Sequence, residues 1–277
     1  MIRTHRIAGR MLTYLALCLG ALVCLVPFLW QVRSSLMTMP EIFAYPPKAL
    51  PAAAQWQNYQ ETFNIIPFGR YYLNTIFLVI LNIVGAVFSN TIIAFSLARL
   101  RFKGRNLMFA LSIGTLMIPT AVTMIPTFIE WNWFGGLGTF MPLFIPAFFG
   151  NAFFIFMLVQ FFRAIPFEYD EAAIMDGASY PRIIFSIIAP MARPIIAVLV
   201  IFTFLNVWND FMGPLLYLNN SKMYTLALGL KSLLSGYNSY WHILMAAATM
   251  VVAPLIVVFF VAQKSFIEGL TMGGIKG

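Results

Sequence analysis

The stretch Tyr72–Ala98, YLNTIFLVILNIVGAVFSNTIIAFSLA, decides the fold class of this chain. It contains no Asp, Glu, Lys or Arg. At about 1.5 Å per helical residue it is long enough to cross about 30 Å of hydrocarbon. Because backbone polar groups inside lipid must be satisfied within the segment itself, such a stretch predicts a transmembrane helix.

The composition extends this prediction to the whole chain. Of its 277 residues, 61% are hydrophobic and 9% are charged, and the mean hydropathy is +0.86. A soluble domain has about 45–50% apolar and about 25% charged residues, so soluble enzymes are excluded. The net charge of +8 lies mostly in short loops beside apolar stretches. Positive charge in short loops is typical of a protein that these charges orient in a lipid bilayer. We therefore expect no nucleic-acid partner.

We predict an all-α integral membrane protein with six transmembrane helices. The transmembrane domain covers residues 11–265, between an N-terminus of residues 1–10 and a C-terminal tail of residues 266–277. Prolines 119, 126, 142, 146, 190, 194 and 254 are expected to break or bend the spans. The six spans are predicted at Met11–Val32, Tyr72–Ala98, Asn106–Ile129, Thr139–Phe162, Ile183–Trp208 and His242–Gln263.

Basic residues predict the orientation, because Lys and Arg are enriched in cytoplasmic loops. With the N-terminus inside, 12 of the 17 Lys and Arg residues are cytoplasmic, and both termini are cytoplasmic. The cytoplasmic set is Arg3, Arg6, Arg10, Arg99, Arg101, Lys103, Arg105, Arg163, Arg182, Arg193, Lys264 and Lys276.

The predicted spans contain almost no ionisable side chain, although an ion-coupled carrier needs such groups near the bilayer midplane. No catalytic constellation is recognisable, and the two histidines, His5 and His242, are too far apart to suggest a metal site. Two interpretations of the polar side chains remain open, hydrogen bonds between helices and contact with a solute. The solute-path candidates are Asn82, Asn90, Asn151, Asn206 and Trp208.

A protein of this kind is passive or takes its energy from another protein, which directs attention to the acidic inner loop, residues 167–182. Glu171–Gly177 is predicted to form a short helix, with acidic residues near its N-terminal end and Gly177 in a left-handed conformation after its last turn. An ordinary interfacial helix would present Lys or Arg to lipid headgroups. Because this segment is acidic, a protein partner with a basic or polar cleft is favoured, and the small Ala172 and Ala173 permit its close approach.

The same loop resembles the EAA signature of ATP-binding-cassette importer permeases. Glu171-Ala172-Ala173, Gly177, Ile187 and Ala189-Pro190 have the spacing of that signature, with Ala189 in place of its usual Leu. The whole chain is similar to the MalG-type permeases of the carbohydrate-uptake branch. The supporting stretches are Asn58-Tyr59, residues 98–104 (ARLRFKG), Trp208-Asn209-Asp210 and residues 269–277 (GLTMGGIKG).

The resemblance implies a six-helix type I permease with a cytoplasmic coupling helix. Its implied partners are a second homologous permease, two ATPase subunits that bind ATP and Mg²⁺, and an extracytoplasmic solute-binding protein; this chain itself is not an enzyme and holds no cofactor. The implied ATPase-coupling residues are Glu171, Ala172, Ala173, Asp176, Gly177 and Pro190. A tail at the ATPase interface would include Thr271, Gly273, Gly274 and Lys276. A loop that probes the binding protein would include Leu234, Ser235, Gly236, Tyr237, Asn238 and Ser239.

The predicted function is the permease subunit of an ATP-driven importer of a sugar or oligosaccharide in a bacterial or archaeal cytoplasmic (inner) membrane. Two alternatives remain, a self-contained secondary carrier and an importer permease for another solute such as glycerol phosphate. A membrane-embedded enzyme is disfavoured because no catalytic constellation is recognisable.

Overall fold

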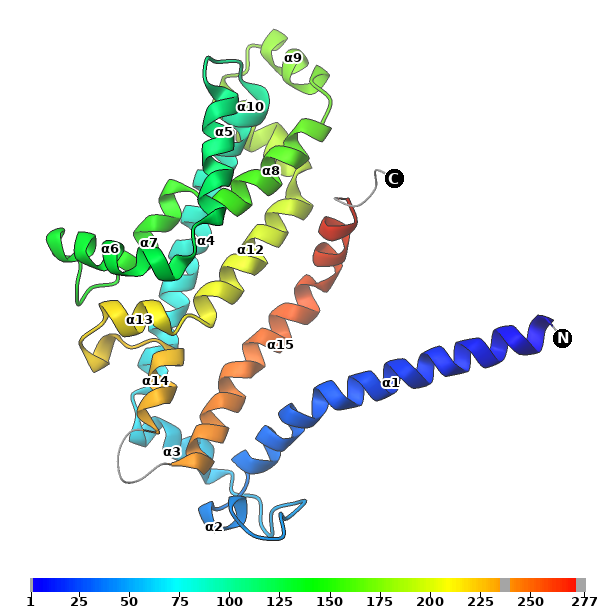
Figure 1. The fold of residues 1–277 in the computed structure, drawn as a ribbon, viewed down its shortest axis with the longest axis vertical. Coiled ribbons are helices and arrows are strands. Elements are labelled where there is room, and N and C mark those ends of the chain that lie inside the picture. The colour runs from blue at the N-terminus through cyan, green and yellow to red at the C-terminus, as the bar shows by residue number, and fades with distance from the viewer. Residues whose placement is uncertain (1, 235–239, 273–277) are drawn as a thin grey trace. The chain divides into compact units, whose positions relative to one another are not determined.

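The computed structural model describes the backbone of residues 2–234 and 240–272 and the side chains of residues 10–234 and 240–263. Helices are its regular elements throughout these ranges (Figure 1). They are α1 (Ile2–Ser35), α2 (Met39–Ile42), α3 (Gln57–Ile65), α4 (Phe68–Arg99), α5 (Arg105–Gly114), η1 (Thr115–Met117), α6 (Thr120–Trp133), α7 (Met141–Phe144), η2 (Ile145–Phe149), α8 (Ala152–Ala164), α9 (Glu168–Met175), α10 (Tyr180–Ile183), η3 (Ile184–Ile188), α11 (Ala189–Met191), α12 (Arg193–Trp208), α13 (Met212–Tyr217), η4 (Ser221–Met223), α14 (Leu226–Ser232) and α15 (Trp241–Met272).

Four helices of the described chain are long and apolar enough to cross a membrane, and there are up to six spans if each of two bent helix pairs is one span. The four are Arg10–Ser35, Phe68–Arg99, Met141–Ala164 and Trp241–Gln263. The third and fifth predicted spans, by contrast, are sharply bent helix pairs, and Met141–Ala164 is itself composed of α7, η2 and α8 with a turn at Gly150. Arg105–Met117 and Thr120–Trp133 meet at 102°, and Tyr180–Met191 and Arg193–Trp208 meet at 86°.

Proline accounts for both bends. Ile118 is extended (φ −86°, ψ 115°) because the residue before a proline avoids the α region, and Pro119 then precedes α6. In the second pair, Pro190 has no N–H to donate to the helical ladder. The preceding turn widens into the π-helix η3, in which the N–H of Ala189 donates to the carbonyl of Ile184. The bend follows at Ala192.

The chain divides into two compact units, and the first comprises residues 1–68 and 230–254. In it, the buried Asn58 amide donates hydrogen bonds to the carbonyls of Ser35 (2.8 Å) and Met37 (3.0 Å) and so ties α3 to the end of α1. Residues 10–33 of α1, by contrast, include no residue that is buried within this chain. That part of α1 is available to lipid or to another protein.

The second unit comprises residues 69–229 and 255–277 and contains the main apolar core. This core joins the C-terminal half of α4 to α8, α9, η3 and α12, through residues such as Phe95, Leu158, Phe162, Ile188 and Leu199. Within this unit α9 lies at one end of the core helices (Figure 1). The acidic loop is therefore attached directly to the ends of the helices that form the core.

Candidate functional site

The acidic loop folds as the short helix α9, Glu168–Met175. Three carboxylates, Glu168, Asp170 and Glu171, lie in its first turn, where the helix dipole favours negative charge. The helix was predicted to begin at Glu171, and it begins three residues earlier. Residue-by-residue propensity does not define helix starts this closely.

The end of α9 is a Schellman motif. Gly177 has φ +75°, its N–H donates to the carbonyl of Ile174 (2.9 Å), and the N–H of Ala178 donates to the carbonyl of Ala173 (2.9 Å). The left-handed conformation predicted for Gly177 is therefore present. It stops the helix and turns the chain toward α10.

The side chains of α9 divide between two faces. Asp170 (8% exposed) and Ala173 (6% exposed), three residues apart, face the interior. The outer face carries the exposed Glu171 and Ala172, together with Met175, which is 87% exposed. Only Ala172 of the two alanines is thus open to a partner, because Ala173 packs into the apolar core.

Asp170 is paired with Arg99, the last residue of α4. The Nη1 atom of Arg99 lies 3.3 Å from Oδ2 of Asp170, and the guanidinium carbon lies 4.5 Å from the ring centre of Phe167 at the start of α9. Burial raises the pKa of Asp170, and the Arg99 charge opposes that shift. No local pattern in the sequence predicts this pair. The available signal was a basic residue ending an apolar span, with an acidic residue three positions before the small Ala173.

The other predicted coupling residues flank this helix. Asp176 is exposed and occupies the C-cap position of α9. Pro190 lies half-buried in α11, next to the bend at Ala192. The loop residues and the bend before α12 are therefore consecutive in the chain and share one apolar core, which includes Ala173, Ile188 and Ala192.

Three of the candidate solute-path amides make hydrogen bonds within or between helices. The Asn82 amide donates to the carbonyls of Leu78 (2.8 Å) and Leu143 (2.9 Å). Asn90 donates to the carbonyl of Ala86 (2.6 Å) and accepts from the backbone N–H of Asn151 (2.7 Å). The Asn151 side chain accepts from the N–H of Phe153 (3.0 Å) and caps α8. These contacts favour the helix-packing interpretation for all three.

The remaining two solute-path candidates lie close together on α12 but differ in exposure. Trp208 is 3% exposed and packs against Phe204 and Tyr72, with ring centres 5.2 and 5.6 Å away. Asn206 is exposed. Of the five candidates, Asn206 and Asn151 have side chains open to the surroundings, and Asn151 is occupied as a helix cap.

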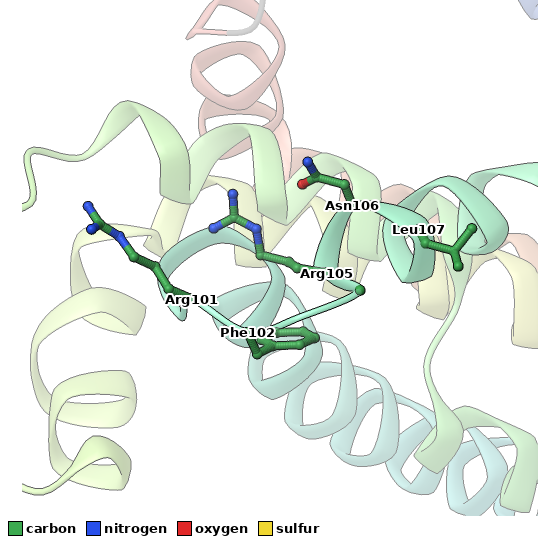
Figure 2. Close-up of a pocket in the computed structure, with 6 residues that line it drawn as sticks. Arg101, Phe102, Arg105, Asn106 and Leu107 are labelled. Carbon is green, nitrogen blue, oxygen red and sulfur yellow. The ribbon is translucent and has the colours of Figure 1, made fainter.

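A small cavity of about 280 Å³ lies in the connection from α4 to α5, and its lining residues are Arg101, Phe102, Gly104, Arg105, Asn106 and Leu107. Arg101, Arg105 and Asn106 extend to the same side (Figure 2). Arg105 also donates to the carbonyl of Leu100 (3.1 Å). Small-molecule sites usually have about 300–1,000 Å³, and this cavity is confined to one connection, so we assign it no solute.

Two predicted sites fall largely outside the described residues. In the predicted binding-protein loop, Leu234 is described and exposed, whereas Ser235, Gly236, Tyr237, Asn238 and Ser239 lie outside. In the predicted tail, the backbone of Thr271 belongs to α15 and its side chain is not described. Gly273, Gly274 and Lys276 lie outside the described residues.

Comparison with known proteins defines the class of this membrane protein. Residues 90–271 match the family described as "Binding-protein-dependent transport system inner membrane component". The match includes α9 and the C-terminal part of α4, which ends at Arg99. The chain belongs to this family. It is a permease of a binding-protein-dependent ABC transporter and a component of the inner membrane.

Individual relatives agree over nearly the whole length. The chain is 30% identical over 265 residues to the diacetylchitobiose uptake system permease protein NgcG of Streptomyces coelicolor, covering 95% of this chain and 87% of that protein. It is 29% identical to the sn-glycerol-3-phosphate transport system permease protein UgpE of Yersinia pestis, covering 93% and 94%.

The fold agrees as well. A chain in the crystal structure of a bacterial ABC transporter involved in the import of the acidic polysaccharide alginate superposes with a TM-score of 0.82 and 25% identity, over 95% of this chain and 98% of that one. The fold class predicted from the sequence, a helical membrane permease of this type, is therefore confirmed in its coarse form.

Proposed function

We propose that this permease imports a sugar or oligosaccharide and that α9 transmits the closure of partner ATPase subunits to its membrane helices. The observation that carries the proposal is the division of α9 into two faces. Glu171, Ala172 and Met175 are exposed, while Asp170 and Ala173 hold the helix against the core of the second unit. A helix with one exposed face and one anchored face is suited to transmit the movement of a partner.

Glu171 is the residue that we assign to the ATPase cleft. It is an exposed carboxylate in the first turn of α9, next to the small Ala172. An ion pair between this carboxylate and a basic residue of the partner would stabilise the docked complex. Removing one member of such a hydrogen-bonded pair costs about 2–5 kcal/mol of binding free energy. Asp176 and Gly177 also belong to the coupling loop, residues 167–182, in which Ala173 packs into the apolar core. Pro190, the last residue assigned to coupling, follows this loop and lies in α11 near the bend at Ala192.

The topology that we propose has six spans, each bent helix pair counting as one, with both termini and the coupling loop in the cytoplasm. The excess of Lys and Arg near the ends of the predicted inner loops supports this orientation. Residues 1–10 and 266–277 are then cytoplasmic, and residues 11–265 form the transmembrane domain.

The proposed complex contains a second homologous permease, two ABC ATPase subunits and an extracytoplasmic binding protein. ATP and Mg²⁺ are bound by the ATPase subunits. The exposed α1 supports contact with the partner permease or with lipid. The predicted tail, with Thr271, Gly273, Gly274 and Lys276, is assigned to the ATPase interface, and the loop from Leu234 to Ser239 is assigned to the binding protein.

The solute class rests on the relatives, which include a diacetylchitobiose permease and an alginate importer. Among the solute-path candidates, Asn206 supports contact with a solute best because its side chain is exposed on α12. Asn82 and Asn90 are committed to helix packing, and Trp208 is buried. The partner permease is expected to supply further contacts.

Glycerol phosphate is the second candidate solute, favoured by the likeness to UgpE over 93% of the chain. Uptake into proteoliposomes separates the candidates when the purified complex is offered sugars and glycerol 3-phosphate in turn with the matching binding proteins. ATP hydrolysis stimulated by a sugar-loaded binding protein supports the proposal. Stimulation by glycerol 3-phosphate alone rejects the sugar assignment.

The experiment that tests the importer mechanism is purification in mild detergent, followed by identification of the co-purifying chains. We expect two ATPase copies and a second permease, and uptake that continues when an ionophore dissipates the ion gradients while ATP persists. Solute accumulation by this chain alone in vesicles, driven by an ion gradient, would reject the mechanism in favour of a secondary carrier.

A further inference from the structure

The ion pair between Arg99 and Asp170 is buried, which sets it apart from ordinary surface pairs. The side chain of Arg99 is 2% exposed and that of Asp170 is 11% exposed. Removing two charges from water costs several kcal/mol for each ion. Charged residues are few in this chain, and two of them lie at a buried site where the desolvation cost is high. Buried charges do not contribute to solubility, so another role is expected for this pair.

The two groups also depend on each other. Within the part of the chain that the structure describes, the three guanidinium nitrogens of Arg99 and both carboxylate oxygens of Asp170 have no hydrogen-bond partner. Their polar contact is the ion pair itself, 3.3 Å between Nη1 and Oδ2. A buried pair of this kind adds little net stability compared with apolar side chains, but breaking it at one partner is costly. Its effect is to specify which groups lie together.

The groups that it joins are the end of α4 and the first turn of α9. Arg99 is the last residue of a 32-residue membrane-spanning helix, and its guanidinium also lies over the ring of Phe167, which immediately precedes α9. Asp170 is adjacent to the exposed Glu171. One guanidinium therefore connects a long membrane helix to the residue next to the proposed docking charge.

The other anchor of α9 is weak. Ala173 is the second buried residue of this eight-residue helix, and its methyl group offers little contact area. The chain turns at Gly177, where φ is +75°, directly after the helix. Without the ion pair, a force on the outer face of α9 would rotate the helix about these small contacts instead of moving α4.

We propose that Arg99 and Asp170 are positioning residues that hold α9 against α4, so that a displacement of α9 by the docked ATPase also moves α4. This inference rests on the proposed function and extends it to the link behind the docking face. Both side chains are buried, so we assign neither residue a contact with the ATPase or the solute. Their loss should reduce the solute moved per ATP hydrolysed, while the ATPase subunits remain bound.

The test uses the complete complex in proteoliposomes and measures uptake and ATP hydrolysis in the same preparation. For Asp170→Asn and Arg99→Gln we expect retained ATPase subunits and a solute-to-ATP ratio that falls about tenfold, within the range by which residues in coupling networks act. The matched control is Glu168→Gln, which removes an exposed carboxylate from the same turn of α9. It should keep the ratio of the unmodified protein.

A second variant separates positioning from simple stability. Arg99→Met combined with Asp170→Leu removes both charges, so that no unpaired buried charge remains. This double variant is therefore expected to assemble even if a single substitution prevents assembly. We expect this variant to show the low ratio as well. An unchanged ratio in Asp170→Asn, or in the double variant, would overturn the proposal.

The docking role of Glu171 is tested by a different measurement from the one that tests the Arg99–Asp170 ion pair. Glu171→Lys is expected to release the ATPase subunits, which is read by co-purification and not by the solute-to-ATP ratio. If Glu171→Lys kept the subunits, the docking proposal would fail, whereas the ratio of Asp170→Asn would still report on the ion pair.

Discussion

The Oδ1 atom of Asn90 accepts a 2.7 Å hydrogen bond from the backbone N–H of Asn151, and this contact joins the middle of α4 to the start of α8. Asn90 is fully buried and also donates to the carbonyl of Ala86. One amide therefore satisfies a backbone donor at the point where Gly150, with φ +90°, turns the chain into α8. The same amide was a candidate for solute contact, and its geometry favours a structural role.

Replacing Asn90 by Ala should destabilise the permease, because the buried Asn90 amide would no longer make its hydrogen bonds to the N–H of Asn151 and the carbonyl of Ala86. The net contribution of a hydrogen bond to stability is about 0.5–1.5 kcal/mol, and a donor left unsatisfied costs more. The measurement is the thermal unfolding midpoint in detergent. Asn206→Ala, at an exposed position of α12, is the control and should change stability by less than about 0.5 kcal/mol. Equal midpoints for the two variants would contradict the prediction.

Replacing Gly177 by Ala should weaken the end of α9 through backbone conformation alone. A Cβ at this position meets no atom within 4 Å, so there is no clash. The φ of +75° nevertheless costs an L-residue about 1–2 kcal/mol. We expect reduced transport with assembly retained, and partial recovery for Gly177→Asn, since Asn tolerates this conformation better.

Gly114 in α5 provides the matched control for that substitution. It also has open space around its Cβ position, but its φ is −55°. Gly114→Ala should therefore be neutral or stabilising, because Ala favours helix. If Gly114→Ala and Gly177→Ala reduced transport equally, the conformational explanation would be wrong.

Glu171→Lys should abolish association with the ATPase subunits, because it reverses the charge on the outer face of α9. Glu168→Lys reverses a charge in the same turn and serves as the control. Co-purification of the ATPase from detergent reports the difference. If the Glu171→Lys permease retained its ATPase subunits, the outer face of α9 would not be the docking surface.

The connection after α1 should lose stability in acid through Glu41. The backbone N–H groups of Thr38 and Ala52 donate to its carboxylate (3.0 Å each) and lower its pKa from 4.5 to about 2. Because the pKa is lower in the folded state, the stabilisation is complete above about pH 4.5 and is lost as the pH falls through about 2. Glu41→Gln should remove this contribution at neutral pH.

The check is the unfolding midpoint of both proteins between pH 7 and pH 3. The difference between the native protein and Glu41→Gln should be largest at pH 7 and should shrink as the pH falls. A difference that stayed constant across this range would mean that the carboxylate charge does not contribute.

Local sequence was sufficient for several features of this protein. Uncharged stretches such as Tyr72–Ala98 predict membrane helices because hydrophobicity and helix length act within one segment. The run of Ala and acidic residues before Gly177 predicts α9 and its end for the same reason, since propensity and the left-handed glycine depend on neighbours in the chain. Prolines at 119 and 190 indicated broken spans, although not the bends of 102° and 86°.

The tertiary structure alone decided which face of α9 is buried. Asp170 and Glu171 are adjacent carboxylates of similar chemistry, yet Asp170 meets Arg99 in the interior while Glu171 is exposed. Likewise, Asn82 and Asn90 have helix-packing partners that lie far along the chain, at Leu143 and Asn151. Pairings between distant segments depend on how the helices pack around the core, and no local spacing contains that information.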